Sequence, residues 1–122
     1  MAENVVGLDV SKGMLGEVES FIKRSANIHF VLADADNTPF RNNCFDMAFA
    51  ITLLQNMPNP HNTLQEVKRI TKPNASIIVT ALKRRFTEHS FLKLLEEADL
   101  KPKLLKTGLN LKCHIATCNK RN

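Results

Sequence analysis

The sequence lacks several features that would assign it to broad classes of protein. No apolar run approaches the ~20 residues needed to cross a bilayer, and no basic, apolar and small-residue sequence typical of a secretion signal occurs. Three cysteines, Cys44, Cys113 and Cys118, match no closely spaced ligand pattern, and the four histidines have no partner at a recognisable spacing. We therefore expect a soluble, cytoplasmic protein with reduced thiols, no metal site and no identifiable catalytic side chain.

What remains is the composition of an ordinary globular domain. The 122 residues are 43% hydrophobic and 24% charged, and single domains cluster around ~100 to 150 residues. No repeat, linker or low-complexity segment divides the chain. We therefore expect one domain over residues 1–122.

Apolar and turn signals alternate along the chain. Strands are predicted at residues 5–8, 28–33, 45–50 and 77–79, the last β-branched and expected to be buried on both faces. A first helix is predicted at 11–26. A second begins after an Asn59-Pro60 cap and ends at a stop formed by Lys72-Pro73-Asn74, and a third is predicted at 87–98 with Thr87 as the cap. A terminal hairpin turns at Gly108-Leu109-Asn110. This order predicts an α/β protein with a mostly parallel sheet, helices on both faces and a C-terminal antiparallel hairpin.

Charge is divided unevenly between the two parts of the chain. Residues 1–71 hold six Lys and Arg against eight Asp and Glu, a net charge of −2, whereas residues 72–122 hold 11 against four, a net charge of +7. The basic part includes the run Lys83-Arg84-Arg85, just after the strand predicted from Ile77 to Ala81. Ligands of open α/β sheets bind beyond the carboxyl ends of strands, so this run could steer an acidic or RNA substrate. The alternative is a solvated loop that aids solubility.

A carboxylate ends the first predicted strand. Many doubly wound α/β proteins bind a nucleotide ribose with such a residue, because Asp can accept hydrogen bonds from both sugar hydroxyls. Asp9 could instead cap the helix that follows it. In these folds the glycine-rich turn that approaches the ligand belongs to the preceding strand and helix, so this sequence starts one βα unit late.

Four segments follow one another in a recognisable order. Residues 7–15 hold Gly-Leu-Asp-Val-Ser and Met-Leu, and residues 33–40 hold Ala-Asp-Ala and Thr-Pro-Phe. Residues 45–60 begin Phe-Asp-Met-Ala and continue to Leu-Gln-Asn-Met-Pro-Asn-Pro, and residues 64–73 hold Leu64, Glu66, Arg69 and Lys72-Pro73. In order and spacing they resemble the motifs of class I S-adenosylmethionine-dependent methyltransferases, of the small Rossmann-like type that acts on metabolites.

The resemblance implies a cofactor and a set of residues that bind it. Asp9 is expected to bind the ribose of S-adenosylmethionine and Asp34 the adenine amino group, although Asp34 could merely hold its own turn. Asp46 is expected to be structural. The cofactor-binding residues implied by the resemblance are Asp9, Val10, Met14, Asp34, Ala35 and Ala50.

The sequence also departs from the family pattern. The glycine-rich loop is absent, and with it the first strand and helix of the family fold; Gln55-Asn56 stand where two histidines are common, and Asn74-Ala75 replace two glycines. The resemblance implies methyl transfer to an unidentified acceptor. The alternative is a non-catalytic methyltransferase-like subunit, for binding or regulation, that needs a partner to complete its fold.

The missing strand has a consequence for assembly. The family strand order is 3-2-1-4-5-7-6, so without the first strand the strands at 5–8 and 45–50 both become edges with unpaired backbone groups. Either they pair directly, or another polypeptide supplies a strand. Because direct closure would shift the packing by ~4.8 Å, we expect self-association, most simply a homodimer.

Overall fold

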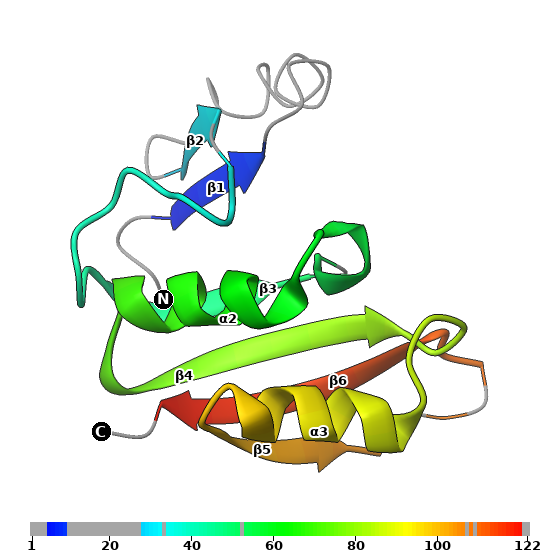
Figure 1. Cartoon of the computed structure of the whole chain (residues 1–122). Helices are drawn as coiled ribbons and strands as arrows, with labels where there is room; N and C mark the ends of the chain where they lie inside the picture. Colours follow the sequence, from blue (N-terminus) through cyan, green and yellow to red (C-terminus); the bar gives the residue numbers. More distant parts are fainter. Residues whose placement is uncertain are drawn as a thin grey trace. The chain divides into compact units, whose positions relative to one another are not determined.

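The chain divides into two compact units, Met1–Pro39 and Phe40–Asn122. A computed structural model describes residues 5–9, 28–32, 34–51, 53–106, 108 and 110–120 (Figure 1). Each unit is described here by itself. The single domain expected over residues 1–122 stays a prediction.

The first unit contains a parallel pair of strands. β1 (Val5–Asp9) pairs with β2 (Ile28–Leu32), in a register that runs from Val5 opposite Ile28 to Asp9 opposite Leu32. Both strands were predicted, and Asp9 is the last residue of β1. The helix predicted at 11–26 lies outside the described residues.

The second unit contains a mixed sheet in the order β3-β4-β6-β5. β3 (Phe45–Ala50) is parallel to β4 (Thr71–Leu82), whereas β6 (Cys113–Lys120) runs antiparallel to both β4 and β5 (Leu100–Leu105). The Rossmann-like α/β fold with a C-terminal antiparallel part is therefore confirmed. The connection between β5 and β6 runs from Lys106 to Lys112 and is longer than the predicted three-residue turn.

Two α-helices of this unit start at the predicted caps. α2 (Pro60–Ile70) begins after Asn59, whose side chain accepts a hydrogen bond of 3.2 Å from the His61 backbone N–H. α3 (Glu88–Glu97) begins after Thr87, whose hydroxyl accepts one of 3.0 Å from the Ser90 N–H. A short 3-10 helix, η1 (Leu54–Asn56), lies between β3 and α2.

The end of α2 differs from the prediction. The helix stops at Ile70 and β4 begins at once with Thr71, so the expected stop at residues 72–74 lies inside the bounds of the strand. The Thr71 hydroxyl donates a 2.6 Å hydrogen bond to the Val67 carbonyl, which satisfies the last helical turn. Thr71 also pairs with Phe45, and the register then shifts before Met47 pairs with Ser76. Pairing with β3 therefore ends the helix before the proline does.

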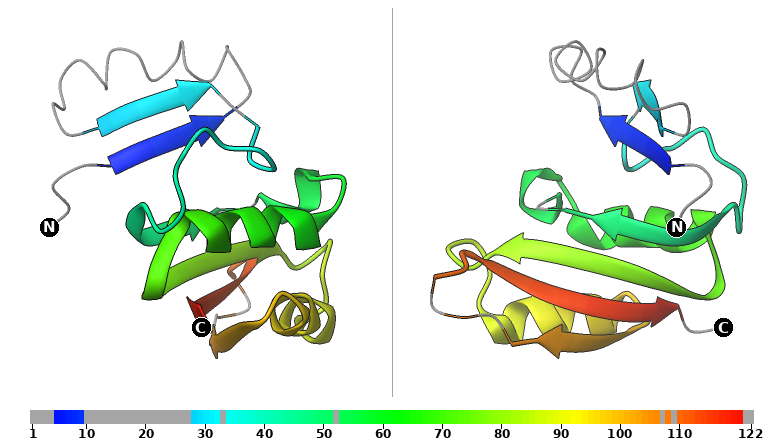
Figure 2. Two further views of the ribbon diagram at one scale, coloured as in Figure 1. Left: turned by 60° about the vertical axis from the view of Figure 1, so that its left-hand side comes forward. Right: turned by 180° about the vertical axis from the view of Figure 1, so that it is seen from behind.

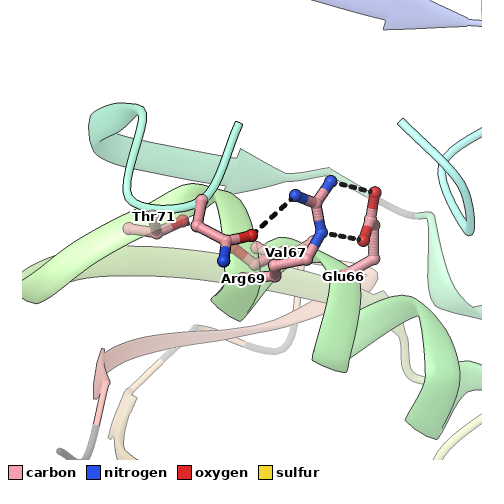
Figure 3. A network of polar contacts seen from close by, with 5 residues as sticks. Glu66, Val67, Arg69 and Thr71 are labelled. Atoms are coloured by element: carbon pink, nitrogen blue, oxygen red, sulfur yellow. Dashed lines mark hydrogen bonds and ion pairs between the residues drawn. The ribbon is translucent and has the colours of Figure 1, made fainter. Parts of the chain in front are cut away.

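Arg69, which forms a bidentate ion pair with Glu66 within α2, also joins this helix to the turn before β3. The Arg69 guanidinium donates to both carboxylate oxygens of Glu66 at 2.7 and 2.8 Å, and to Asn42 Oδ1 at 2.9 Å (Figure 3). The hydrogen bonds to Glu66 raise the pKa of Arg69. Two backbone hydrogen bonds of 2.8 Å join the same two segments: the Asn43 N–H donates to the Arg69 carbonyl, and the Cys44 N–H donates to the Ile70 carbonyl. The entry to β3 is thus held by the end of α2.

Both α-helices lie against the same face of the four-stranded sheet (Figure 2). Ile77 and Val79 point into the core beneath them and are fully buried, whereas Ile78, between them, is only partly buried. The run is therefore less evenly buried than predicted, because the described helices of this unit cover the face that carries Ile77 and Val79. The core consists of Ala50, Leu54, Leu64, Ile77, Val79, Ala81, Phe91, Leu95, Ala98, Leu100, Ala116 and Cys118.

Candidate functional site

Two carboxylates follow neighbouring parallel strands of the first unit. Asp9 ends β1 and lies opposite Leu32, the last residue of β2. Asp34 comes two residues after Leu32 in the sequence. Because the carboxyl ends of parallel strands meet at one edge of a sheet, the fold brings the backbone positions of both aspartates to that edge, where α/β sheets bind ligands. The side chains of Asp9, Val10 and Met14 lie outside the described part of the chain.

Asp34 holds a turn and is exposed. Its Oδ1 accepts a hydrogen bond of 2.9 Å from the Asp36 N–H, and its carbonyl accepts one of 3.0 Å from the Asn37 N–H. A carboxylate has about four acceptor positions on its two oxygens, so this turn leaves Oδ2 able to accept from a further donor. The turn also orients the carboxylate, and Ala35 lies within it. The structural role and the ligand role of Asp34 are therefore compatible.

Ala50 belongs to the second unit and ends β3. It is 2% exposed and its methyl group is part of the core cluster. A ligand at this strand end would therefore meet the backbone of Ala50 rather than its side chain.

Asp46 has a partner within the sheet. Its carboxylate accepts from Lys72 Nζ at 2.7 Å, and this hydrogen bond raises the pKa of Lys72. The side chain of Asp46 is 88% exposed. The pair joins the second residues of the adjacent strands β3 and β4, in agreement with the structural role expected for Asp46.

His114 has a structural contact that its place in the sequence did not indicate. It is buried on β6, where its Nε2 lies 2.8 Å from the Phe86 carbonyl and its ring stacks on Phe91 with centroids 5.6 Å apart. Cys118 lies on the same strand, and burial raises the pKa of its thiol to about 12. In the described part of the chain, no three His, Cys, Asp or Glu residues gather as metal ligands would, and no helix is long and apolar enough to span a membrane.

Several solved structures with a fold similar to that of this chain are methyltransferases. An S-adenosylmethionine-dependent methyltransferase from Aquifex aeolicus matches 94% of this chain and 68% of its own, with a TM-score of 0.82 and 19% identity. A chain from the complex between the Haloferax volcanii Trm112 methyltransferase activator and a methyltransferase matches 98% of this chain and 73% of its own, with a TM-score of 0.86 and 14% identity. The class is therefore that of the Rossmann-like methyltransferase fold.

The sequence comparisons give the family. The methyltransferase domain family matches residues 1–79, and the chain belongs to it. A demethylmenaquinone methyltransferase of Staphylococcus haemolyticus is 39% identical over 74 residues, which cover 61% of this chain and 31% of the relative. An uncharacterised protein of Methanocaldococcus jannaschii is 31% identical over 102 residues, covering 83% of this chain and 45% of the relative. The matched part of the chain thus spans about a third of the length of the first relative and less than half of the length of the second.

Proposed function

We propose that this chain binds S-adenosylmethionine and transfers its methyl group to an acceptor that is still to be identified. The observation that carries this proposal is the pair of carboxylates, Asp9 and Asp34, that follow the adjacent parallel strands β1 and β2. Membership of the methyltransferase domain family supports it. We further propose that the protein acts in the cytoplasm.

The residues divide the proposed binding task between them. Asp9 accepts from the ribose hydroxyls, and Asp34, oriented by its turn, accepts from the adenine amino group through Oδ2. Val10, Met14 and Ala35 follow these carboxylates in the sequence. Ala50, in the second unit, stays a cofactor-binding residue predicted from the family resemblance alone. When bound, the cofactor would supply an electrophilic methyl group on a sulfonium, from which the neutral thioether is an excellent leaving group. Much of the barrier is therefore lowered by holding the acceptor in line with the methyl carbon, and this needs no acid or base.

Calorimetry with S-adenosylhomocysteine tests the cofactor site. For residues 1–122 alone we expect a dissociation constant in the millimolar range, because this segment holds no glycine-rich loop whose backbone could donate hydrogen bonds at ~1 kcal/mol each, and ~1.4 kcal/mol corresponds to tenfold in affinity. Asp9→Ala should abolish the binding. Asp46→Ala is the matched control, because it removes an aspartate that pairs with Lys72 in the second unit, and it should bind as the parent does.

Two outcomes would contradict the assignments. Sub-micromolar affinity would show that the chain does not depend on a glycine-rich loop, and unchanged binding by Asp9→Ala would refute the ribose assignment. A chain that binds the cofactor product but transfers no methyl group to any acceptor would instead match the non-catalytic subunit, which no observation on the structure favours.

A second proposal concerns the edge strand β3. Among the described residues it pairs on one side alone, with β4, and three side chains of alternating residues, Met47, Phe49 and Ile51, are 49%, 61% and 58% exposed. A strand edge with exposed apolar side chains favours pairing with another strand. We propose that β3 of a second copy occupies it. In an antiparallel pairing centred on Ala48, Met47 of each copy lies opposite Phe49 of the other. The exposed apolar side chains of the two copies then pack against each other.

Light scattering over a concentration series tests this pairing. The parent chain should form dimers, and Phe49→Lys should shift the equilibrium to monomers because it places like charges at the paired edge. Leu111→Lys is the matched control, since Leu111 is 50% exposed but lies outside β3. A parent chain that stays monomeric and unfolds in one cooperative transition would refute the proposal.

A further inference from the structure

Two loops of the second unit carry basic side chains to the same end of the sheet. β4 ends at Leu82, which pairs with Cys113 at the start of β6, and Leu105 at the end of β5 pairs with Ile115. The loop after β4 and the connection before β6 therefore emerge together, next to the end of β3 (Figure 1). We call the basic residues of these loops the basic rim, which consists of Lys83, Arg84, Arg85, Lys106 and Lys112.

Hydrogen bonds hold the two loops together. The Lys83 N–H donates to the Lys112 carbonyl at 2.8 Å, and Lys83 Nζ donates to the Gly108 carbonyl at 3.4 Å. His114 Nε2, 2.8 Å from the Phe86 carbonyl, fixes the first loop from within the core. The fold thus places the basic residues of the run at 83–85 next to Lys106 and Lys112, which are far from them in the sequence.

The charge of the basic rim is not neutralised locally. Residues 83–87 and 106–112 contain no Asp or Glu. Arg84, Arg85, Lys106 and Lys112 are exposed, and within the described part of the chain none of them makes an ion pair. At the opposite end of the sheet, by contrast, Lys72 pairs with Asp46. The basic rim is therefore a one-sign surface.

A row of lysines extends the basic rim along the edge strand β5. Lys101 and Lys103 are exposed, while Pro102 and Leu104 between and after them are partly buried. Alternate residues of a strand share one face and lie ~6.7 Å apart. The row leads from the strand to Lys106. This elongated arrangement matches a linear polyanion better than a compact acid.

We propose that the basic rim and the lysines of β5 bind the phosphate backbone of single-stranded RNA. The basic rim lies beyond the carboxyl ends of the parallel strands β3 and β4, where α/β sheets bind their ligands. Lysine is depleted at interfaces between proteins, so its abundance here favours RNA over an acidic protein. Phosphate contacts position a nucleic acid without reading its sequence.

Fluorescence anisotropy with a labelled oligouridylate tests the proposal. Affinity should fall steeply between about 50 and about 200 mM salt, with a log–log slope of ~0.7 for each phosphate contacted by single-stranded nucleic acid. A variant with Arg84→Gln, Arg85→Gln and Lys112→Gln should lose about 2 units of that slope. The matched control is Arg41→Gln, Lys72→Gln and Lys93→Gln. Both variants lower the formal net charge from +5 to +2, but the control should keep the slope of the parent chain.

Several results would overturn the proposal. Equal losses in both variants would mean that RNA responds to net charge and not to the basic rim. No binding at low salt, or equally strong competition by polyglutamate, would also refute it. The assay contains no cofactor, and the basic rim variant should bind S-adenosylhomocysteine as the parent does. Failure of RNA binding is therefore distinguishable from failure of the proposed methyl transfer. Unchanged thermal transitions in both variants verify that they fold.

Discussion

The two units of this chain differ in how much of their own structure can stabilise them. Among the described residues, the first unit has one parallel ladder, β1 with β2, whereas the second has four strands, two α-helices and a core of residues that are at most 2% exposed. An isolated pair of strands is marginally stable in water at best. The comparison therefore indicates that the proposed cofactor carboxylates lie on the less stable part of the molecule, and the proposed RNA surface on the more stable part.

Hydrogen exchange should show the largest difference between the units. β4 and β6 are the inner strands of the sheet and each pairs with a strand on both sides. Exchange of their amide hydrogens should therefore require global unfolding. Amides of β1 and β2 should open at a free energy lower by at least about 4 kcal/mol, and thus exchange roughly 10³-fold faster. Equal protection in both units would break the comparison. Added S-adenosylhomocysteine should selectively slow exchange in β1.

Thiol reactivity gives the next largest effect, within the second unit. Burial raises the pKa of Cys118 from 9.0 to about 12, so its thiolate fraction falls roughly 10³-fold and the native thiol should resist alkylation. Exposed Cys44 should react first, and Cys44→Ser should remove the fast phase.

The same shift predicts a pH dependence of stability. The Cys118 thiol stays protonated in the folded state up to about pH 12, whereas in the unfolded chain it ionises above about 9. Its contribution to the free energy of unfolding is therefore complete below pH 9 and is lost as the pH rises towards 12. Fast labelling of Cys118 in the native protein would contradict its burial.

Truncation of a leucine should lower the free energy of unfolding much more in the core than on the surface. Leu95 is a fully buried residue of α3, and Leu95→Ala should lower the free energy of unfolding by about 2–5 kcal/mol, through lost transfer energy and a cavity. Leu111→Ala makes the same chemical change at a residue that is 50% exposed, and should stay within about 0.5 kcal/mol of the parent. Denaturant titration measures both values, and similar losses would refute the core assignment.

The smallest expected effect is that of a helix cap. Thr87→Ala removes the hydroxyl that accepts from the Ser90 N–H at 3.0 Å, and should cost about 1 kcal/mol. Thr87→Ser keeps the acceptor and should recover most of this loss. No difference between the two variants would mean that water replaces the cap.

Much of the fold could be predicted from the sequence, because the signals involved are local. β1, β2 and β3 were predicted from their apolar runs, and the starts of α2 and α3 from Asn59-Pro60 and Thr87. The candidate carboxylates, Asp9 and Asp34, were identified from their place after strands and from the order of the family motifs. The roles proposed for them stay predictions.

What the sequence by itself determined was therefore the type and order of the elements, since hydrophobic period and capping residues act over a few positions. Only the tertiary structure decided which faces and loops meet. The partial burial of Ile78 depends on which side of the sheet the helices cover, and the start of β4 at Thr71 depends on pairing with Phe45. The basic rim depends on β4 and β6, which bring Lys83 beside Lys112. Each of these results from contacts between residues far apart in the chain, for which local pattern carries no signal.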